Sequence, residues 1–177
     1  MANDPAPDAL EPDEDRIWLR QYPAHVEWRT EFAQRPMGTL LDDAVARFGD
    51  RPAFDFLGQQ TSYSQLGALV ARAAKGLQAR GAGPGTHIAL LLPNCLYYPI
   101  FYFAALKIGA TVVNCNPLYT PRELNNQIQD SQASILVTLD LAALWDKAVT
   151  LADAGLIRHT IICPFAKQLP LGKNVLF

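Results

Sequence analysis

Several residue types are scarce in this 177-residue sequence, and each scarcity argues against a class of protein. It has three cysteines, Cys95, Cys115 and Cys163, widely spaced in apolar surroundings, which favours core packing in a reducing compartment over disulfides or a metal centre. The longest apolar run, 95–106, has 12 residues, far short of the roughly 20 that cross a bilayer. The first fifteen residues contain no lysine or arginine, unlike the basic start of a secretory signal. These absences predict a cytoplasmic globular protein without a transmembrane helix.

Acidic residues are missing from one long stretch of the chain. Residues 1–15 hold six acids and no base and are expected to form a disordered acidic tail, so residues 16–177 carry eleven acids against fifteen bases. No acid occurs over 57–121. This lack of acids is explained by burial of the segment's strands and helices, and an anionic partner is the alternative explanation. No run of basic residues alternates with aromatic residues as nucleic-acid binding requires. We therefore expect no nucleic-acid partner.

Strand and helix patterns alternate along most of the chain. The aromatic-rich segment 16–37 is expected to lie as an extended strap on a folded body. Hydrophobic periodicity predicts helices that start near Thr39, Ser64, Asn94, Thr120 and Leu141, and strands over 53–57, 61–63, 87–92, 111–115, 134–138 and 158–163. From residue 87 onward this order predicts an α/β fold, with a largely parallel sheet, right-handed crossovers and flanking helices.

Local signals specify some helix ends. Thr120-Pro121-Arg122-Glu123 is a capping box with proline at the first helical position. Thr39 and Ser64 are expected to cap the two earlier helices. The glycine-rich segment 81–85 follows a helix and opens a strand, whereas a dinucleotide-binding loop follows a strand and opens a helix. We interpret 81–85 as a connector.

The chain shows no recognisable catalytic arrangement. His25, His87 and His159 do not accompany a serine or cysteine in a nucleophile elbow and are interpreted as structural. The paired carboxylates Asp42 and Asp43 are interpreted as part of a solvated helix face. The residues thus predict no catalytic residue and no metal ligand in this chain.

Two segments resemble sequence signatures of a known superfamily. They are Thr-Ser-Tyr-Ser-Gln-Leu at 61–66 and Leu-Lys-Ile-Gly-Ala-Thr-Val-Val-Asn-Cys-Asn-Pro at 106–117. They resemble the first two signatures of the superfamily of acyl- and aryl-CoA synthetases, adenylation domains and luciferases. Within that superfamily, four segments resemble bacterial long-chain fatty acid–CoA ligases in particular. They are 18–23, 91–94, 129–131 and, most specifically, Asn-Pro-Leu-Tyr-Thr-Pro-Arg-Glu-Leu at 116–124. The likeness runs from about Arg16 to the end of the chain. Thr86-His87 departs from the Asp-Arg pair that the family often has, and residues 165–177 show little pattern.

The resemblance implies that a fatty acid reacts with ATP, assisted by Mg²⁺, to an acyl-adenylate, from which the thiol of CoA displaces AMP. It also implies that the phosphate-binding loop, the ribose-binding aspartate and the C-terminal lysine come after residue 177. Residues 16–177 are then expected to be a partial N-terminal α/β domain, truncated before that loop, inactive alone and without a tightly bound cofactor. Tyr119 and Arg122 are the candidate cofactor-binding residues, on the CoA side, with packing of Tyr119 and mere surface placement of Arg122 as the alternative.

Two other functions stay open. One is an aryl- or medium-chain acyl-CoA ligase of the same superfamily, and the other is a free-standing binding or assembly module without catalysis. Apolar faces that pack on a larger body in a complete ligase are expected to make this chain self-associate. Peripheral contact with the inner face of the membrane also stays open, although core burial explains the amphipathic helices more simply.

Overall fold

The computed structural model describes residues 17–27 and 30–170, so the acidic tail expected over 1–15 lies outside the described residues. The chain divides into two parts, residues 1–34 and 35–177, and each is described by itself. The described residues of the first part include the short 3-10 helix η2 (Ile17–Gln21), and none of them is buried. The strap over 16–37 stays a prediction.

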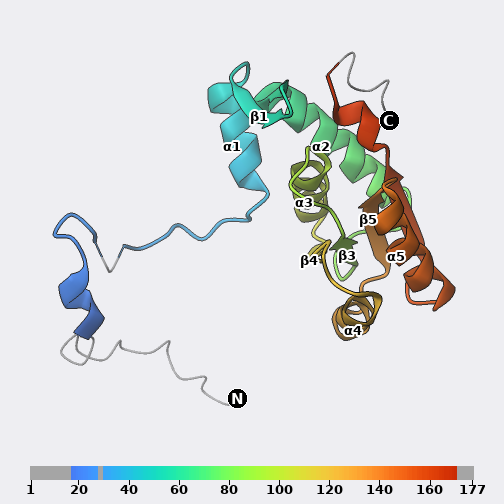
Figure 1. The fold of residues 1–177 in the computed structure, drawn as a ribbon. Helices are drawn as coiled ribbons and strands as arrows, with labels where there is room; N and C mark the ends of the chain where they lie inside the picture. The colour runs from blue at the N-terminus through green and yellow to red at the C-terminus, as the bar shows by residue number, and fades with distance from the viewer. Residues whose placement is uncertain (1–16, 28–29, 171–177) are drawn as a thin grey trace, which may run out of the picture. The chain divides into compact units, whose positions relative to one another are not determined.

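The second part alternates strands and helices in the predicted order (Figure 1). Its elements are α1 (Thr39–Phe48), β1 (Pro52–Phe56), β2 (Gln59–Ser62), α2 (Tyr63–Gln78), β3 (His87–Leu90), α3 (Tyr97–Lys107), β4 (Thr111–Asn114), α4 (Pro121–Ser131), β5 (Ile135–Leu139), α5 (Ala142–Asp153), β6 (His159–Cys163) and the 3-10 helix η3 (Phe165–Gln168). The strand bounds agree with the sequence-based ones within two residues.

Four strands form a parallel sheet in the order β4-β3-β5-β6, and β1 pairs with β2 in a separate antiparallel hairpin. In the central register Ile88 of β3 lies beside Val112 of β4 and Ile135 of β5. The predicted α/β fold with a parallel sheet is confirmed. The strand order shows that the chain leaves β3 on one side for β4 and returns on the other side to β5.

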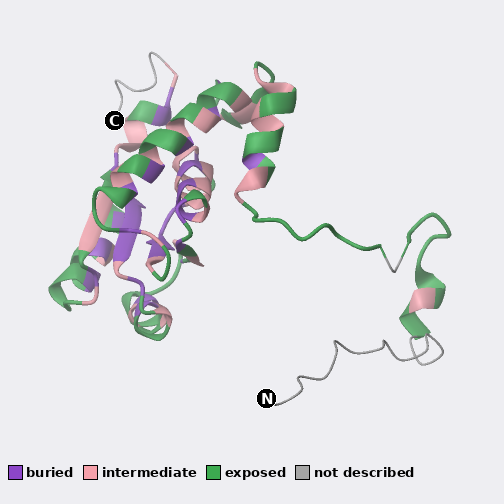
Figure 2. Ribbon diagram, turned by 180° about the vertical axis from the view of Figure 1, so that it is seen from behind, coloured by how far each residue is buried: buried purple, intermediate pink, exposed green. Residues whose placement is uncertain are grey.

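Helices cover both faces of this sheet. Right-handed crossovers place α3 on one face and α4 and α5 on the other, in agreement with the packing of α2 on α3 and of α4 on α5. Figure 2 shows burial concentrated along the sheet and exposure on the outer helix surfaces. The central strands β3 and β5 supply fully buried side chains, among them Ile88, Leu90, Leu136 and Leu139. Among the described residues, no helix is both long and apolar enough to cross a membrane.

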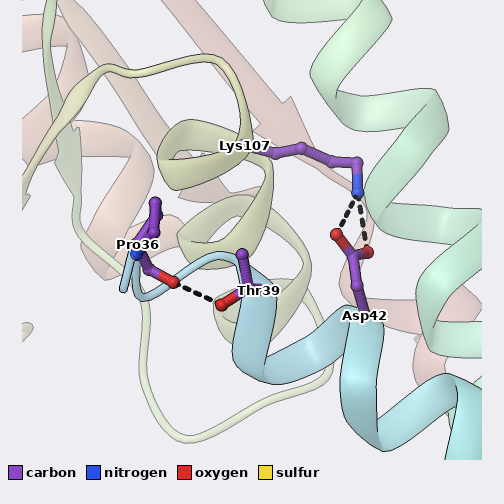
Figure 3. Close-up of polar contacts among 4 residues, drawn as sticks. All are labelled: Pro36, Thr39, Asp42 and Lys107. Carbon is purple, nitrogen blue, oxygen red and sulfur yellow. Dashed lines mark hydrogen bonds and ion pairs between the residues drawn. The ribbon is translucent and has the colours of Figure 1, made fainter. Parts of the chain in front are cut away.

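The predicted cap of the first helix is wrong. Gly38, not Thr39, is the N-cap of α1, and it offers no side chain to the helix. The Thr39 hydroxyl instead donates to the Pro36 carbonyl oxygen at 2.7 Å (Figure 3). The helix therefore begins on a backbone turn and not on a side-chain cap.

The carboxylates of α1 do more than face solvent. Lys107 of α3 donates from Nζ to both oxygens of Asp42, at 2.7 and 2.9 Å, and so links α1 to α3 (Figure 3). Asp43 forms an ion pair with Arg35. Both carboxylates remain more than half exposed, so the predicted solvation is correct but the interpretation missed their partners.

The cap predicted for the second helix is also wrong. Ser62, not Ser64, is the N-cap of α2, because the helix begins at Tyr63, a residue that the sequence assigned to the preceding strand. The Ser62 hydroxyl accepts from the Gln65 backbone N–H at 3.2 Å, and the Gln65 side-chain oxygen accepts from the Ser62 N–H at 2.9 Å. This reciprocal pair is a capping box that the sequence reading missed.

The hairpin turn is tighter than expected. Leu57 and Gly58 form a two-residue turn with φ of 55° and 94°, whereas the sequence suggested a turn over 58–60. Two positive φ values are the geometry of a type I′ turn, which matches the twist of a hairpin. Gln59 and Gln60 consequently belong to β2.

Strand β3 is shorter than the apolar run that predicted it. Leu91 and Leu92 are buried but follow the end of β3. The next helix begins at Tyr97 instead of Asn94, and Pro99 lies in its first turn, as expected. The apolar run thus specified burial correctly and the strand end incorrectly.

All three cysteines are buried and free, in agreement with the expected core packing. Burial raises the pKa of Cys115 to about 11 and, with a smaller contribution from nearby titratable groups, the pKa of Cys163 to about 12. These thiols stay neutral at physiological pH and are poor nucleophiles.

Candidate functional site

The carboxyl ends of the four parallel strands lie at one edge of the sheet, where open α/β sheets present their ligands. At this edge β4 ends at Asn114, and residues 115–120 lead into α4. This loop and the first turn of α4 carry Tyr119 and Arg122, the two residues predicted to bind the cofactor. We take the loop and that turn as the candidate site.

A tight turn gives the loop its shape. Asn116 accepts from the Leu118 N–H through its side-chain oxygen and from the Tyr119 N–H through its carbonyl oxygen, both at 3.0 Å. The Leu118 residue is consequently 87% exposed and Tyr119 is 37% exposed. The turn thus presents side chains to solvent instead of burying them.

The first turn of α4 is fixed by the predicted capping box, which the structure confirms. The Thr120 hydroxyl accepts from the Glu123 N–H at 3.3 Å, and a Glu123 carboxylate oxygen accepts from the Thr120 N–H at 2.8 Å. The same oxygen accepts from the Thr120 hydroxyl at 2.8 Å. These bonds to the ionised form lower the pKa of the Glu123 carboxyl group.

Arg122 lies in this turn with its side chain exposed. Its guanidinium group has no hydrogen bond or ion pair with the described residues, so it can accept an anionic partner. The amino end of a helix carries partial positive charge, which disfavours an unpaired arginine and favours an anion held by it. Exposure of both Arg122 and Tyr119 fits a ligand contact, and for Arg122 it equally fits mere surface placement.

Contacts from distant helices fix the base of the loop. Lys147 of α5 donates to the Pro117 carbonyl oxygen at 2.6 Å. Before the loop, the Asn114 carbonyl oxygen accepts from Gln127 at 2.9 Å and its side-chain oxygen accepts from Tyr98 at 3.0 Å. The sequence reading missed these residues, because no motif joins positions that only the packing of α3, α4 and α5 brings together.

The other residues weighed in the sequence lie away from this loop. Gly81 and Gly85, both at φ 80°, lie between α2 and the start of β3, as expected of a connector. His87 and His159 are the first residues of β3 and β6, at the opposite, amino edge, and His87 contacts the Ser131 carbonyl oxygen. In the part of the chain that the structure describes, no three His, Cys, Asp or Glu side chains are placed to hold a metal ion.

Comparison with known proteins agrees with this architecture. The family model described as AMP-binding enzyme matches residues 41–172. A long-chain-fatty-acid–CoA ligase of Bacillus subtilis is 33% identical over 90% of this chain, which spans 28% of the relative. One of Escherichia coli is 38% identical over 91% of the chain and 29% of the relative. A salicyl-AMP ligase of Mycobacterium tuberculosis is 34% identical over 72% of the chain and 24% of the relative.

Solved structures share the fold. A long-chain-fatty-acid-CoA ligase from Archaeoglobus fulgidus matches with a TM-score of 0.67 and 20% identity, over 76% of this chain and 28% of the other. A benzoate CoA ligase from Burkholderia xenovorans matches with a TM-score of 0.66 and 20% identity, over 73% and 26%. The chain thus spans somewhat over a quarter of the length of these proteins. Because the family model covers most of the chain, the chain belongs to the AMP-binding enzyme family.

Proposed function

We propose that this chain is the N-terminal scaffold portion of an AMP-forming long-chain fatty acid–CoA ligase. The observation that carries the proposal is the alignment of about nine tenths of the chain with bacterial ligases of this type. The 116–124 segment, whose sequence resembles these ligases, forms the exposed loop and the capped first turn of α4. In this proposal the parallel sheet is framework, and the loop is part of the substrate-side wall.

The reaction has two steps. The fatty acid carboxylate attacks the α-phosphorus of ATP and displaces diphosphate, which leaves an acyl-adenylate. The CoA thiol then attacks the acyl carbonyl carbon, loses its proton and displaces AMP. Mg²⁺ supplies charge neutralisation at the triphosphate, but the described residues offer it no ligand set. We expect these 177 residues alone to be inactive, because they span only 28–29% of the ligases that they match, and synthesis of acyl-AMP by them would contradict this.

The role of the loop in this reaction is to contact CoA. Arg122 can pair with a CoA phosphate, and Tyr119, which is 37% exposed, can lie against the nucleotide. In the complete ligase, Arg122→Ala is expected to raise the KM for CoA several-fold and to leave the KM for ATP unchanged. Arg158→Ala is the matched control, because Arg158 is an exposed arginine just before β6, at the opposite edge of the sheet. An unchanged KM for CoA in Arg122→Ala would remove Arg122 from the site.

An aryl- or medium-chain acyl-CoA ligase is the second candidate. The salicyl-AMP ligase is 34% identical over 72% of this chain, whereas the fatty-acid ligases match over about nine tenths of it, and the benzoate CoA ligase shares the fold. A panel of C8, C12 and C16 fatty acids, benzoate and salicylate, assayed as AMP release by the complete protein, separates the two. Preference for benzoate or salicylate would replace the long-chain assignment, and turnover of none would favour a binding or assembly module.

The proposal also includes that the chain self-associates and that it is located in the cytoplasm. A groove of about 190 Å³ lies between α5 and β6, and its lining includes Trp145, Val149 and Ile162, which are each more than a third exposed. A second copy of the chain covering this groove would remove that apolar surface from water. A strictly monomeric species in sedimentation at high concentration would contradict this, and sedimentation with anionic vesicles tests peripheral membrane contact.

A further inference from the structure

The parallel sheet has two outer edges, and their backbone groups differ in whether they are bonded. The strands β4 and β6 form these edges. At the β4 edge, the Asn114 carbonyl oxygen accepts from the Gln127 side chain at 2.9 Å, so a side chain of α4 occupies this edge. At the β6 edge, no other strand among the described residues pairs with the outer side. An unpaired edge strand offers its N–H and C=O groups to another chain.

The backbone hydrogen bonds of β6 show which of its residues face outward. The Cys163 carbonyl oxygen accepts from the Asp140 N–H at 3.2 Å, so the backbone of Cys163 faces β5. Successive residues of a strand direct their backbone groups to opposite sides. Ile162 therefore directs its N–H and C=O groups away from the sheet, and so does Thr160, two residues earlier. These two residues present four backbone groups at the open edge.

The neighbouring positions on either side of this pair are already bonded. Before the pair, the Arg158 N–H donates to the Ser134 carbonyl oxygen at 2.8 Å. After the pair, Pro164 has no N–H, and its carbonyl oxygen accepts from the Tyr97 hydroxyl at 3.1 Å. The open part of the edge is therefore limited to the two residues between them that face outward.

A second copy of the chain can satisfy all four of these groups. When a two-fold axis passes beside Ile161, antiparallel pairing places Thr160 of each copy opposite Ile162 of the other. Each such pair exchanges two hydrogen bonds. A shift of the register by two residues would place Arg158 or Pro164 opposite one of the pair and lose hydrogen bonds. A two-fold interface joins the same patch of both copies, and this edge is complementary to itself in that way.

The side chains on the α5 face favour the same pairing. Thr160 and Ile162 line the groove of about 190 Å³ together with residues of α5 that include Trp145 and Val149. Pairing of the two β6 strands brings the grooves of both copies to the axis, where apolar surface from each is removed from water. The strand contains no Asp, Glu, Lys or Arg, so the pairing places no like charges opposite one another.

We propose that two copies of this chain pair through antiparallel β6 strands centred on Ile161, so that their two sheets become one continuous sheet. The proposal names the contact for the self-association proposed above and rests on that part of the proposed function. It does not depend on ligase activity, because neither ATP nor CoA takes part in the contact.

Cysteine substitution tests the register. In this pairing the two Ile161 Cα atoms are about 4.5 Å apart, a distance that a disulfide can bridge, whereas the two Ile162 Cα atoms are about 7–8 Å apart. Under mild oxidation, Ile161→Cys is expected to form dimers roughly ten times faster than Ile162→Cys. Exposure predicts the opposite order, because Ile162 is the more exposed residue. Cross-linking that is faster at Ile162, or absent at both positions, would overturn the proposal.

Sedimentation equilibrium measures the association itself. Ile162→Lys is expected to weaken dimer formation roughly tenfold or more, because it places a charge beside the apolar groove of both copies. Leu40→Lys is the matched control, because Leu40 lies on α1 and is 39% exposed, against 36% for Ile162. Equal weakening by the two variants, or no weakening by Ile162→Lys, would place the interface elsewhere. An unmodified chain that stays monomeric would exclude both the contact and the self-association.

Amide hydrogen exchange of the unmodified chain gives a readout that does not depend on the folding of a variant. The N–H groups of Thr160 and Ile162 are expected to exchange rapidly in dilute solution and slowly at concentrations where sedimentation shows dimers. The Ile161 N–H, which faces β5, should stay protected at both concentrations. Protection of Thr160 and Ile162 in the monomer would mean that another segment of the chain covers the edge. Rapid exchange in the dimer would mean a different interface, and either result would overturn the proposal whether or not the complete protein is a ligase.

Discussion

The centre of the sheet and the loop after β4 lie close together in the fold but are stabilised by different forces. Leu136 of β5 has no exposed surface, whereas Leu118 of the loop is 87% exposed. The centre is maintained by apolar burial, and the loop by hydrogen bonds of Asn116, Thr120 and Lys147. A buried sheet that carries an exposed loop held by hydrogen bonds is an arrangement that can position binding residues on a stable scaffold.

The largest effect is expected in the centre of the sheet. Leu136→Ala removes side-chain atoms that are fully buried and leaves a cavity, so it should lower the free energy of unfolding by about 2–5 kcal/mol. Leu118→Ala, the same change in the loop, should alter it by less than about 0.5 kcal/mol. Urea unfolding of the two variants measures the contrast, and equal losses would show that the loop is packed and not exposed.

An intermediate effect is expected at the start of α4. Thr120→Ala removes the capping hydroxyl and should cost about 1 kcal/mol. Ser64→Ala is the matched control, because Ser64 lies inside α2 and is not its cap, and its loss should be within about 0.5 kcal/mol. If the Ser64 variant lost as much as the Thr120 variant in urea unfolding, the observed start of α2 would be wrong.

A smaller effect is expected for the ion pair between Asp42 and Lys107 (Figure 3). Both side chains are exposed, so a double-mutant cycle with Asp42→Asn and Lys107→Met should give a coupling of about 0.2–1 kcal/mol. Molar salt should reduce this coupling, because exposed charges are screened. A salt-independent coupling would show that the pair is protected from solvent.

The smallest effect is a pH dependence of the capping box. Hydrogen bonds from Thr120 lower the folded-state pKa of Glu123 below 4.5, so the stabilisation is present above the unfolded-state pKa and is lost as the pH falls through the folded-state value. Amide hydrogen exchange at the start of α4, followed from pH 5 to pH 3, should show protection falling in the unmodified protein. Glu123→Gln should show a weaker pH response, and an identical response would exclude Glu123 as its source.

The comparison of the two regions also separates what sequence patterns could predict from what they could not. The box at Thr120 was predictable because both of its partners lie within four residues and proline fixes the first helical position. The box at Ser62 was missed because Ser62 and Tyr63 also suit a strand, which moved the expected N-cap by two residues, to Ser64. Local signals therefore specify an element reliably only when no neighbouring residue fits the competing structure.

The candidate site shows the same division at longer range. Tyr119 and Arg122 were found from their place between a strand and a helix, and the structure leaves both accessible. Lys147, which anchors the loop through Pro117, lies 30 residues away and carries no local signal. A pocket of about 610 Å³ lined by β2, α2, α3 and η3 could likewise not be predicted, because these elements meet there only after the sheet has formed.

The sequence by itself determined the alternation of strands and helices, the burial of the apolar runs and the cap of α4, because these depend on side-chain periodicity and on contacts within a few residues. The tertiary structure alone decided the order β4-β3-β5-β6 and the links from Lys107 to Asp42 and from Lys147 to Pro117. These features depend on which surfaces pack together, and burial of apolar area is non-directional, so one pattern of hydrophobic residues is compatible with several arrangements until the whole core has formed.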